Sequence, residues 1–140
     1  MELIIDSNIV FSALLKKENN CKRIIFSDNF EIYSCNFLFV EIFKHKNKIQ
    51  LLSELSEEEI LIQIDKILSR VNFVNDNLIS TNIYYQAFIL CKDYDPSDTP
   101  FIALLLFLNV PLLTGDKVIY EPLKQKNFNI LAVKDIINLI

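Results

Sequence analysis

Short apolar runs alternate along the chain with longer segments in which apolar residues recur at helical spacing. The short runs are typical of buried strands in a parallel sheet, and they predict strands at 3–5, 31–35, 73–74, 111–114 and 129–133. The segments between them predict helices, one of which opens on a capping box at Ser56–Glu59. Helices are therefore expected at 8–17, 21–27, 36–48, 56–71, 80–91, 98–108 and after residue 133.

This alternation predicts a single α/β domain over residues 1–140. The expected architecture is a three-layer α/β/α sandwich with a central, mainly parallel sheet of four or five strands. In such sheets the functional groups gather outside the carboxyl ends of the strands. Polar residues that directly follow a predicted strand are therefore the first candidates for a functional site.

Four carboxylates are predicted to meet at that edge. Asp6 follows the first strand, and Asp116 stands just past the fourth predicted strand. The apolar run Phe101–Leu113 predicts a buried helix–turn–strand hairpin, which would return Asp98 and Asp116 at its two ends to one rim. Glu41, inside the third helix, can point over the same edge. We therefore expect these four carboxylates to share one pocket.

Each of the four also has a purely structural interpretation. Asp98 stands just before a Thr-Pro pair, a favourable arrangement for a helix N-cap. Asp116 beside the only glycine is typical of a turn, and Glu41 alone would be a solvated helix residue. Asp6 is harder to explain in this way, because a carboxylate after a buried strand is costly unless it is paired or metal-bound. The combination favours a shared functional site.

Composition excludes several other kinds of site. A single glycine, Gly115, is too few for a P-loop or a dinucleotide-binding fingerprint. The only histidine, His45, argues against a histidine-rich zinc site or a Ser-His-Asp triad. The three cysteines are widely spaced, which favours buried thiols in a reducing compartment over a nucleophile or a metal site; they are Cys21, Cys35 and Cys91.

Two further expectations concern location and assembly. The start, MELIID, lacks a basic leader, and the longest apolar run is shorter than the roughly 20 residues that span a bilayer. A cytoplasmic protein without membrane association is therefore expected. An apolar fraction of 51%, with several large aliphatic residues in the helix that ends near Val71, predicts self-association as a homodimer.

Four stretches in order along the chain resemble the PIN-domain family. They are IIDSNIVFSALL at 4–15, FVEIFKHKNKI at 39–49, DPSDTPFIAL at 95–104 and LLTGDK at 112–117. This family of PilT N-terminus-like, metal-dependent nucleases includes many toxins of toxin–antitoxin pairs. The resemblance implies that the catalytic and metal-binding residues are Asp6, Glu41, Asp98 and Asp116. It also implies that Asn8 and Thr114 are polar helpers. Asp95 is a second candidate for the acidic residue of the third stretch, and we place it behind the ligands.

The resemblance implies a magnesium- or manganese-dependent endoribonuclease, acting as the toxin of a type II pair with a small antitoxin protein. The residue types agree, because carboxylate oxygens suit Mg²⁺ and Mn²⁺. One or two such ions can activate a water molecule and stabilise charge at phosphorus. A net charge of −4 is a poor match for a protein that coats nucleic acid, but ions among the carboxylates would offset it.

A basic stretch just beyond Glu41 is a candidate contact for the RNA backbone. The stretch contains Lys44, His45, Lys46 and Lys48, although such a stretch is equally typical of a solvated helix end. Lys117, next to Asp116, is a weaker candidate of the same kind.

Two other functions stay open. One is a catalytically inactive PIN-like module that binds RNA or a protein partner. The other, a phosphate-handling receiver-like domain, is disfavoured because Asp6 has no acidic neighbour and no phosphoacceptor aspartate follows a middle strand. Ion-dependent cleavage of RNA separates a nuclease from a binding module.

Overall fold

A five-stranded, all-parallel sheet forms the centre of the molecule in a computed structural model that describes residues 1–140. The strand order is β3-β2-β1-β4-β5. The predicted α/β/α class and parallel sheet are confirmed. The strands are β1 (Glu2–Ile5), β2 (Glu31–Cys35), β3 (Val71–Val74), β4 (Leu112–Leu113) and β5 (Ile130–Leu131).

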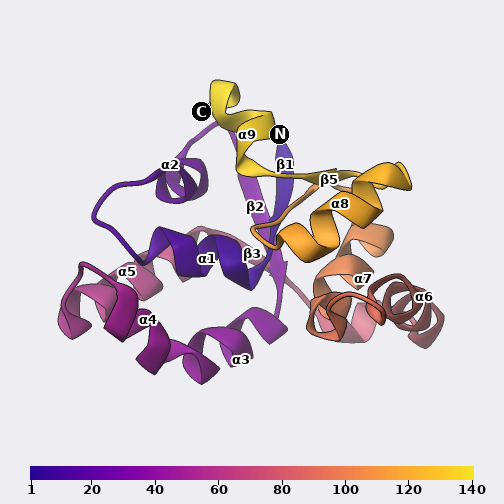
Figure 1. The fold of residues 1–140 in the computed structure, drawn as a ribbon, viewed down its shortest axis with the longest axis horizontal. Helices are drawn as coiled ribbons and strands as arrows, with labels where there is room; N and C mark the ends of the chain where they lie inside the picture. The colour runs from indigo at the N-terminus through magenta and orange to yellow at the C-terminus, as the bar shows by residue number, and fades with distance from the viewer.

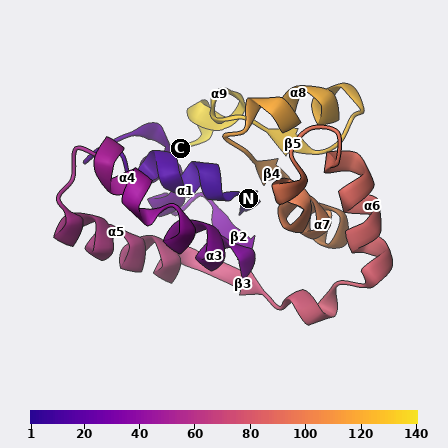
Figure 2. The same cartoon turned by 60° about the horizontal axis from the view of Figure 1, so that its bottom comes forward.

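Helices cover both faces of the sheet (Figures 1 and 2). The crossovers from β1 through β2 to β3 place α1 to α5 on one face, and those from β3 through β4 to β5 place α6 to α8 on the other, as right-handed connections require. The first group is α1 (Ser7–Ala13), α2 (Asn20–Phe26), α3 (Phe37–Lys44), α4 (Lys46–Leu52) and α5 (Glu57–Arg70). The second group and the terminal helix are α6 (Thr81–Cys91), α7 (Thr99–Leu108), α8 (Lys117–Gln125) and α9 (Val133–Ile136). Short 3₁₀ turns lie at Asp76–Leu78, Pro96–Asp98 and Ile137–Leu139.

α7 packs against β1, β2 and β4 on one side and α6 on the other. Its residues Phe101–Leu105 are all buried, which explains the near-continuous apolar run. Asn109 ends the helix in the left-handed conformation (φ 52°), a common helix C-terminus, and the chain turns into β4. The predicted buried hairpin is confirmed. Apolar as α7 is, no helix combines the length and the apolarity needed to cross a membrane.

Two parts of the predicted helix pattern are wrong. The single helix expected at 36–48 is interrupted at His45 (φ −103°, ψ 7°), so that α3 ends and α4 begins around this residue. α8 has no counterpart in the sequence prediction, because Pro122 inside it lacks a backbone donor and resembles a helix breaker. Asp116 starts this helix instead: its Oδ1 accepts a hydrogen bond from the N–H of Val118 at 2.9 Å.

The three cysteines form no disulfide. Cys35 and Cys91 are buried and Cys21 is partly buried, which agrees with their interpretation as small apolar residues of the interior.

Candidate functional site

The carboxyl edge of the sheet brings the ends of β1 and β4 together. The two strands are hydrogen-bonded neighbours, with Ile5 opposite Leu113. The crossovers change direction between them, and in open α/β sheets ligands bind at such a switch point. Asp6 directly follows β1, and Asp116 lies three residues past β4. The prediction that these two aspartates emerge at the same edge of the sheet is confirmed.

Asp6 is buried, and both of its carboxylate oxygens accept hydrogen bonds. Oδ1 accepts from the N–H of Ile9 at 3.0 Å, which caps α1, and from the N–H of Gly115 at 3.5 Å. Oδ2 accepts from the hydroxyl of Thr114. The same hydroxyl oxygen accepts from the N–H of Asp116 at 3.0 Å. Asp6 therefore holds the loop that carries Asp116, with Thr114 as the intermediary.

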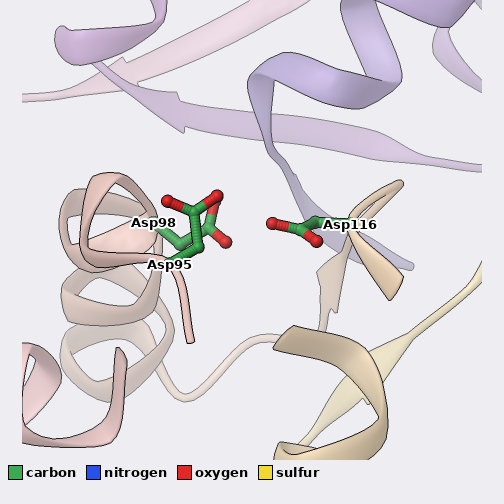
Figure 3. Close-up of side chains that lie close together, drawn as sticks. All are labelled: Asp95, Asp98 and Asp116. Carbon is green, nitrogen blue, oxygen red and sulfur yellow. The ribbon is translucent and has the colours of Figure 1, made fainter. Parts of the chain in front are cut away.

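Three aspartates form an acidic cluster at this rim: Asp95, Asp98 and Asp116 (Figure 3). One carboxylate oxygen of each lies within 4.8 Å of the others. Asp95 caps the 3₁₀ turn that Asp98 closes, and such a turn has about three residues per turn, so the two side chains lie on the same side. Asp116 points toward them from the loop after β4. The structure thus brings Asp98 and Asp116 together as expected and adds Asp95, for which the three-residue spacing in DPSD is the sequence signal.

Asp98 is the carboxylate of the acidic cluster without a structural partner. It is only 6% exposed, and its Oδ2 is buried without a hydrogen bond. It occupies the N-cap position of α7 as the sequence suggests, but its side chain makes no capping hydrogen bond to this helix. A buried anionic oxygen with no donor is costly, and a cation would offset that cost. The donor set, oxygens only, fits Mg²⁺ or Mn²⁺.

The raised pKa values of two aspartates at the site also show that ionised carboxylates are unfavourable there. Burial, followed by the hydrogen bond shared with Asp116 and the charges of the neighbouring aspartates, raises the pKa of Asp98 to about 9. Burial also raises the pKa of Asp6 to about 6, against the effect of its three hydrogen bonds. Burial acts in the same direction on Asp95, but hydrogen bonds, first that of the Ser97 side chain, outweigh it and lower this pKa. Without a cation, Asp98 therefore keeps its proton at neutral pH.

Glu41 is buried in α3, so the solvated interpretation is wrong. It is not a member of the acidic cluster. Its Oε2 lies 3.3 Å from Nε2 of His45, one turn further along the chain. His45 in turn packs edge-on against Phe11 of α1, with ring centroids 5.4 Å apart. Of the four expected carboxylates, the structure thus places Asp98 and Asp116 in the cluster, connects Asp6 to it through Thr114, and pairs Glu41 with His45.

A groove of about 430 Å³ runs between α1 and α4 and reaches Asp116. Asn8 lines it next to Gly115, where a Cβ added to the glycine would lie 3.0 Å from the Asn8 Cβ. Asn8 makes no hydrogen bond to the carboxylates, so its expected helper role stays a prediction. The groove is apolar along much of its length and basic at its sides, where its lining includes Phe11, Leu15, Ile49, Leu52, His45, Lys48 and Lys117.

The lysines predicted to contact an RNA backbone occupy different positions. Lys117 lines the groove directly beside Asp116. Lys44 is exposed at the end of α3, and the Nζ of Lys46 lies 3.5 Å from Oε1 of Glu57. Lys48, one turn beyond Lys44, lines the groove. The groove therefore favours Lys48 and Lys117 as backbone contacts.

Comparisons with known proteins agree with this geometry. The sequence matches the profile of the PIN domain over residues 4–130. A search of curated proteins found no match. Among solved structures, the fold is similar to that of VapBC-1 from nontypeable Haemophilus influenzae, with a TM-score of 0.65 over 96% of this chain and 99% of that chain, at 18% identity. Because the family match covers most of its length, this chain belongs to the PIN-domain family.

Proposed function

We propose that this protein is a ribonuclease that depends on Mg²⁺ or Mn²⁺ and hydrolyses RNA phosphodiester bonds at the acidic cluster. The observation that carries the proposal is the buried Oδ2 of Asp98, which has no hydrogen-bond partner and belongs to a side chain that faces Asp95 and Asp116. A hard divalent cation is the ligand that such a set of oxygens suits best. Membership of the PIN-domain family supports the assignment to nucleases.

Within this proposal, Asp98 and Asp116 hold the ion at the mouth of the groove. When bound, the ion would activate a water molecule and offset the charge that develops at phosphorus. Asp6 keeps Asp116 in position through Thr114, which accepts the Asp116 N–H at 3.0 Å. Glu41 adds negative charge at the groove end of α3, beside His45. Asp6 and Glu41 remain proposed members of the catalytic set on the strength of the motif resemblance.

The groove between α1 and α4 is the proposed path of the RNA strand. Lys48 and Lys117 lie along it and can neutralise phosphates, and Phe11 offers an aromatic surface to a base. The groove ends at Asp116, so a strand that follows it arrives at the acidic cluster. Because Lys48 and Lys117 lie in the groove itself, the groove can attract phosphate groups although the whole chain has a net charge of −4.

We further propose that the protein is the toxin of a type II toxin–antitoxin pair, acts in the cytoplasm, and is neutralised by a small antitoxin protein. The motif resemblance and the similarity of fold to VapBC-1 support this pairing. Co-purification with the product of a neighbouring small gene that encodes a DNA-binding peptide would test it.

A second candidate function is a PIN-like module that binds RNA or protein without cutting it. The pairing of Glu41 with His45, away from the acidic cluster, favours this alternative, because a carboxylate held by another partner is less available to an ion. The two candidates differ in one observable, the cleavage of a bound RNA.

Cleavage of a mixed RNA substrate with Mg²⁺ or Mn²⁺, and with EDTA as control, tests the proposal. We expect ion-dependent cleavage by the wild type and a loss of at least about 10²-fold in Asp98→Asn and Asp116→Asn. Asp93→Asn, an exposed aspartate two residues before Asp95, is the matched control and should cut normally. RNA that is bound but never cut, with either ion, would favour the binding module instead.

A further inference from the structure

We propose that Asp95 is a direct ligand of the divalent ion, with Asp98 and Asp116, and not merely a turn-capping residue behind the site. The inference rests on the proposed function only in taking the acidic cluster as the place where the ion binds. It concerns ion binding alone, so it can be tested without any RNA.

The distances allow three carboxylates to bind one ion. Neighbouring oxygens of an octahedral Mg²⁺ are about 3.0 Å apart and opposite ones about 4.2 Å, because each lies about 2.1 Å from the metal. One oxygen each of Asp95, Asp98 and Asp116 already lies within 4.8 Å of the others. Movements of about 1 Å at the tips of these side chains would therefore bring all three into coordination.

Each of two aspartates of the cluster uses one carboxylate oxygen within its own helical turn. Oδ1 of Asp95 accepts from the N–H of Ser97 at 3.1 Å and from the Ser97 hydroxyl at 2.6 Å. Oδ1 of Asp116 accepts from the N–H of Val118 at 2.9 Å. In both residues Oδ2 takes no hydrogen bond from the turn, and the only groups that compete for it are the other carboxylates of the cluster.

The buried Oδ2 of Asp98 is the independent sign that the cluster takes a ligand. It has no hydrogen-bond partner, and Asp98 is more than nine-tenths buried. Figure 3 shows the Asp116 carboxylate directed toward those of Asp95 and Asp98. A cation bound among the three would contact oxygens of all of them and satisfy the Oδ2 that has no partner.

The other acids of the rim are less available. Both oxygens of Asp6 are engaged, by Ile9 and Gly115 on one side and by Thr114 on the other. Glu41 lies with His45. Asp95 is therefore the third carboxylate that the geometry offers to an ion, a role that its capping bond to Ser97 conceals in the sequence.

A crystal of the full chain soaked in MnCl₂ gives the direct test. We expect an anomalous peak for manganese within about 2.5 Å of oxygens from Asp95, Asp98 and Asp116. A peak bound by Asp98 and Asp116 while every Asp95 oxygen lies beyond about 3.5 Å would overturn the inference, since that distance excludes coordination.

Calorimetric titration with MnCl₂ supplies the test in solution. Asp95→Asn keeps an oxygen that can accept from Ser97, so the turn should survive, and we expect its manganese affinity to fall at least about tenfold. The matched control Asp93→Asn should stay within about twofold of the wild type. An unchanged affinity in Asp95→Asn would count against the inference; if this variant does not fold, Asp95→Ser, which also retains an acceptor oxygen, takes its place. Normal manganese binding without RNA cleavage would refute the proposed function alone and leave this inference standing.

Discussion

Asp98 combines three conditions that each oppose ionisation. It is buried, it lies among other carboxylates, and it makes no hydrogen bond through Oδ2. A side chain that only stabilised this position would accept a hydrogen bond from an N–H of α7, as Asp6 accepts one from α1. The Asp98 side chain instead suits a bound ion, so we expect the metal-free protein to be less stable than it would be without this carboxylate.

The pH dependence of that loss can be predicted from the sign of the shift. Burial and the neighbouring carboxylates raise the pKa of Asp98 in the folded state to about 9, far above the ordinary value of about 3.9, so the folded state holds this proton more tightly than the unfolded state does. The penalty is absent below the unfolded pKa, grows as pH rises from about 4 to about 9, and is complete above the folded pKa. In EDTA, the stability of Asp98→Asn relative to wild type should therefore rise with pH, by up to about 1.4 kcal/mol per pH unit in this window.

Urea unfolding of both proteins at pH 5, 7 and 9 measures this difference. Groups away from the acidic cluster titrate alike in the two proteins and cancel, and Asp93→Asn provides the surface control. The difference therefore reports Asp98 together with the aspartates that its charge affects. Saturating Mn²⁺ should stabilise the wild type and much less the variant, because only the native site binds the ion tightly. Parallel curves for wild type and Asp98→Asn across the pH range would contradict the prediction.

At the scale of elements, the groove between α1 and α4 gives a prediction about RNA affinity. Lys48→Gln and Lys117→Gln should each raise KM for RNA and leave kcat nearly unchanged, because these lysines face the strand and not the reacting phosphate. Each should also lower the salt dependence of binding by about 0.7 in the slope of log K against log salt, the value for one phosphate contact on a single strand. Lys46→Gln should do less, since Lys46 is paired with Glu57.

Binding measured at several salt concentrations checks these expectations. Lys66→Gln, an exposed lysine on α5 outside the groove, is the control and should match the wild type. If Lys66→Gln weakened binding as much as Lys117→Gln, the RNA would follow a different surface.

The elements themselves could largely be predicted from the sequence, because most of them carry their own signals. Apolar runs predicted the five strands, and Ser56 and Ser80 cap α5 and α6 with side-chain hydrogen bonds to Glu59 and Ile83. The interruption at His45 could not be predicted from the sequence pattern, and it accompanies a tertiary contact that local spacing does not show, the packing of the His45 ring against Phe11 of α1. α8 was obscured by Pro122, a local signal that packing of the helix against β5 overrides.

The site shows the same division between local and tertiary information. That Asp6 and Asp116 emerge at one edge follows from their places after two parallel strands, which the sequence pattern predicts. That these two strands are neighbours comes from the structure. Whether a carboxylate makes a capping hydrogen bond depends on the rotation of its side chain. Asp98 stands at the N-cap position of α7 but makes no such bond. Asp95 makes one and also belongs to the acidic cluster. No spacing rule distinguishes these cases, because both residues begin a helical turn.

For the whole molecule, self-association stays a prediction, but its physical basis changes. The aliphatic residues of α5 that suggested it are mostly inside: Ile60, Ile64 and Ile67 are buried. Exposed apolar side chains gather instead on α3 and α4, where Val40, Phe43 and Leu51 are more than half exposed. A surface of this kind is unusual on a monomer and indicates an interface between copies.

We expect a homodimer at working concentrations that Phe43→Glu converts to a monomer of 16.3 kDa. A charge in a buried apolar interface is costly, whereas the same change at a free surface is not. Ile89→Glu on α6, a residue exposed to a similar degree, is the control and should remain dimeric. Light scattering measures the molar mass of the wild type and of both variants. A wild type that is monomeric at every concentration would contradict the prediction.

The pairing of β1 with β4 also bears on the order in which the chain folds. Ile5 lies opposite Leu113, so the centre of the sheet joins the first strand to the fourth, and a long loop must close before their hydrogen bonds form. Asp6 reaches Thr114, and through it the N–H of Asp116, only after this closure. A folding intermediate in which the helices have formed but β1 has not yet paired with β4 would therefore leave Asp116 without the contacts that position it.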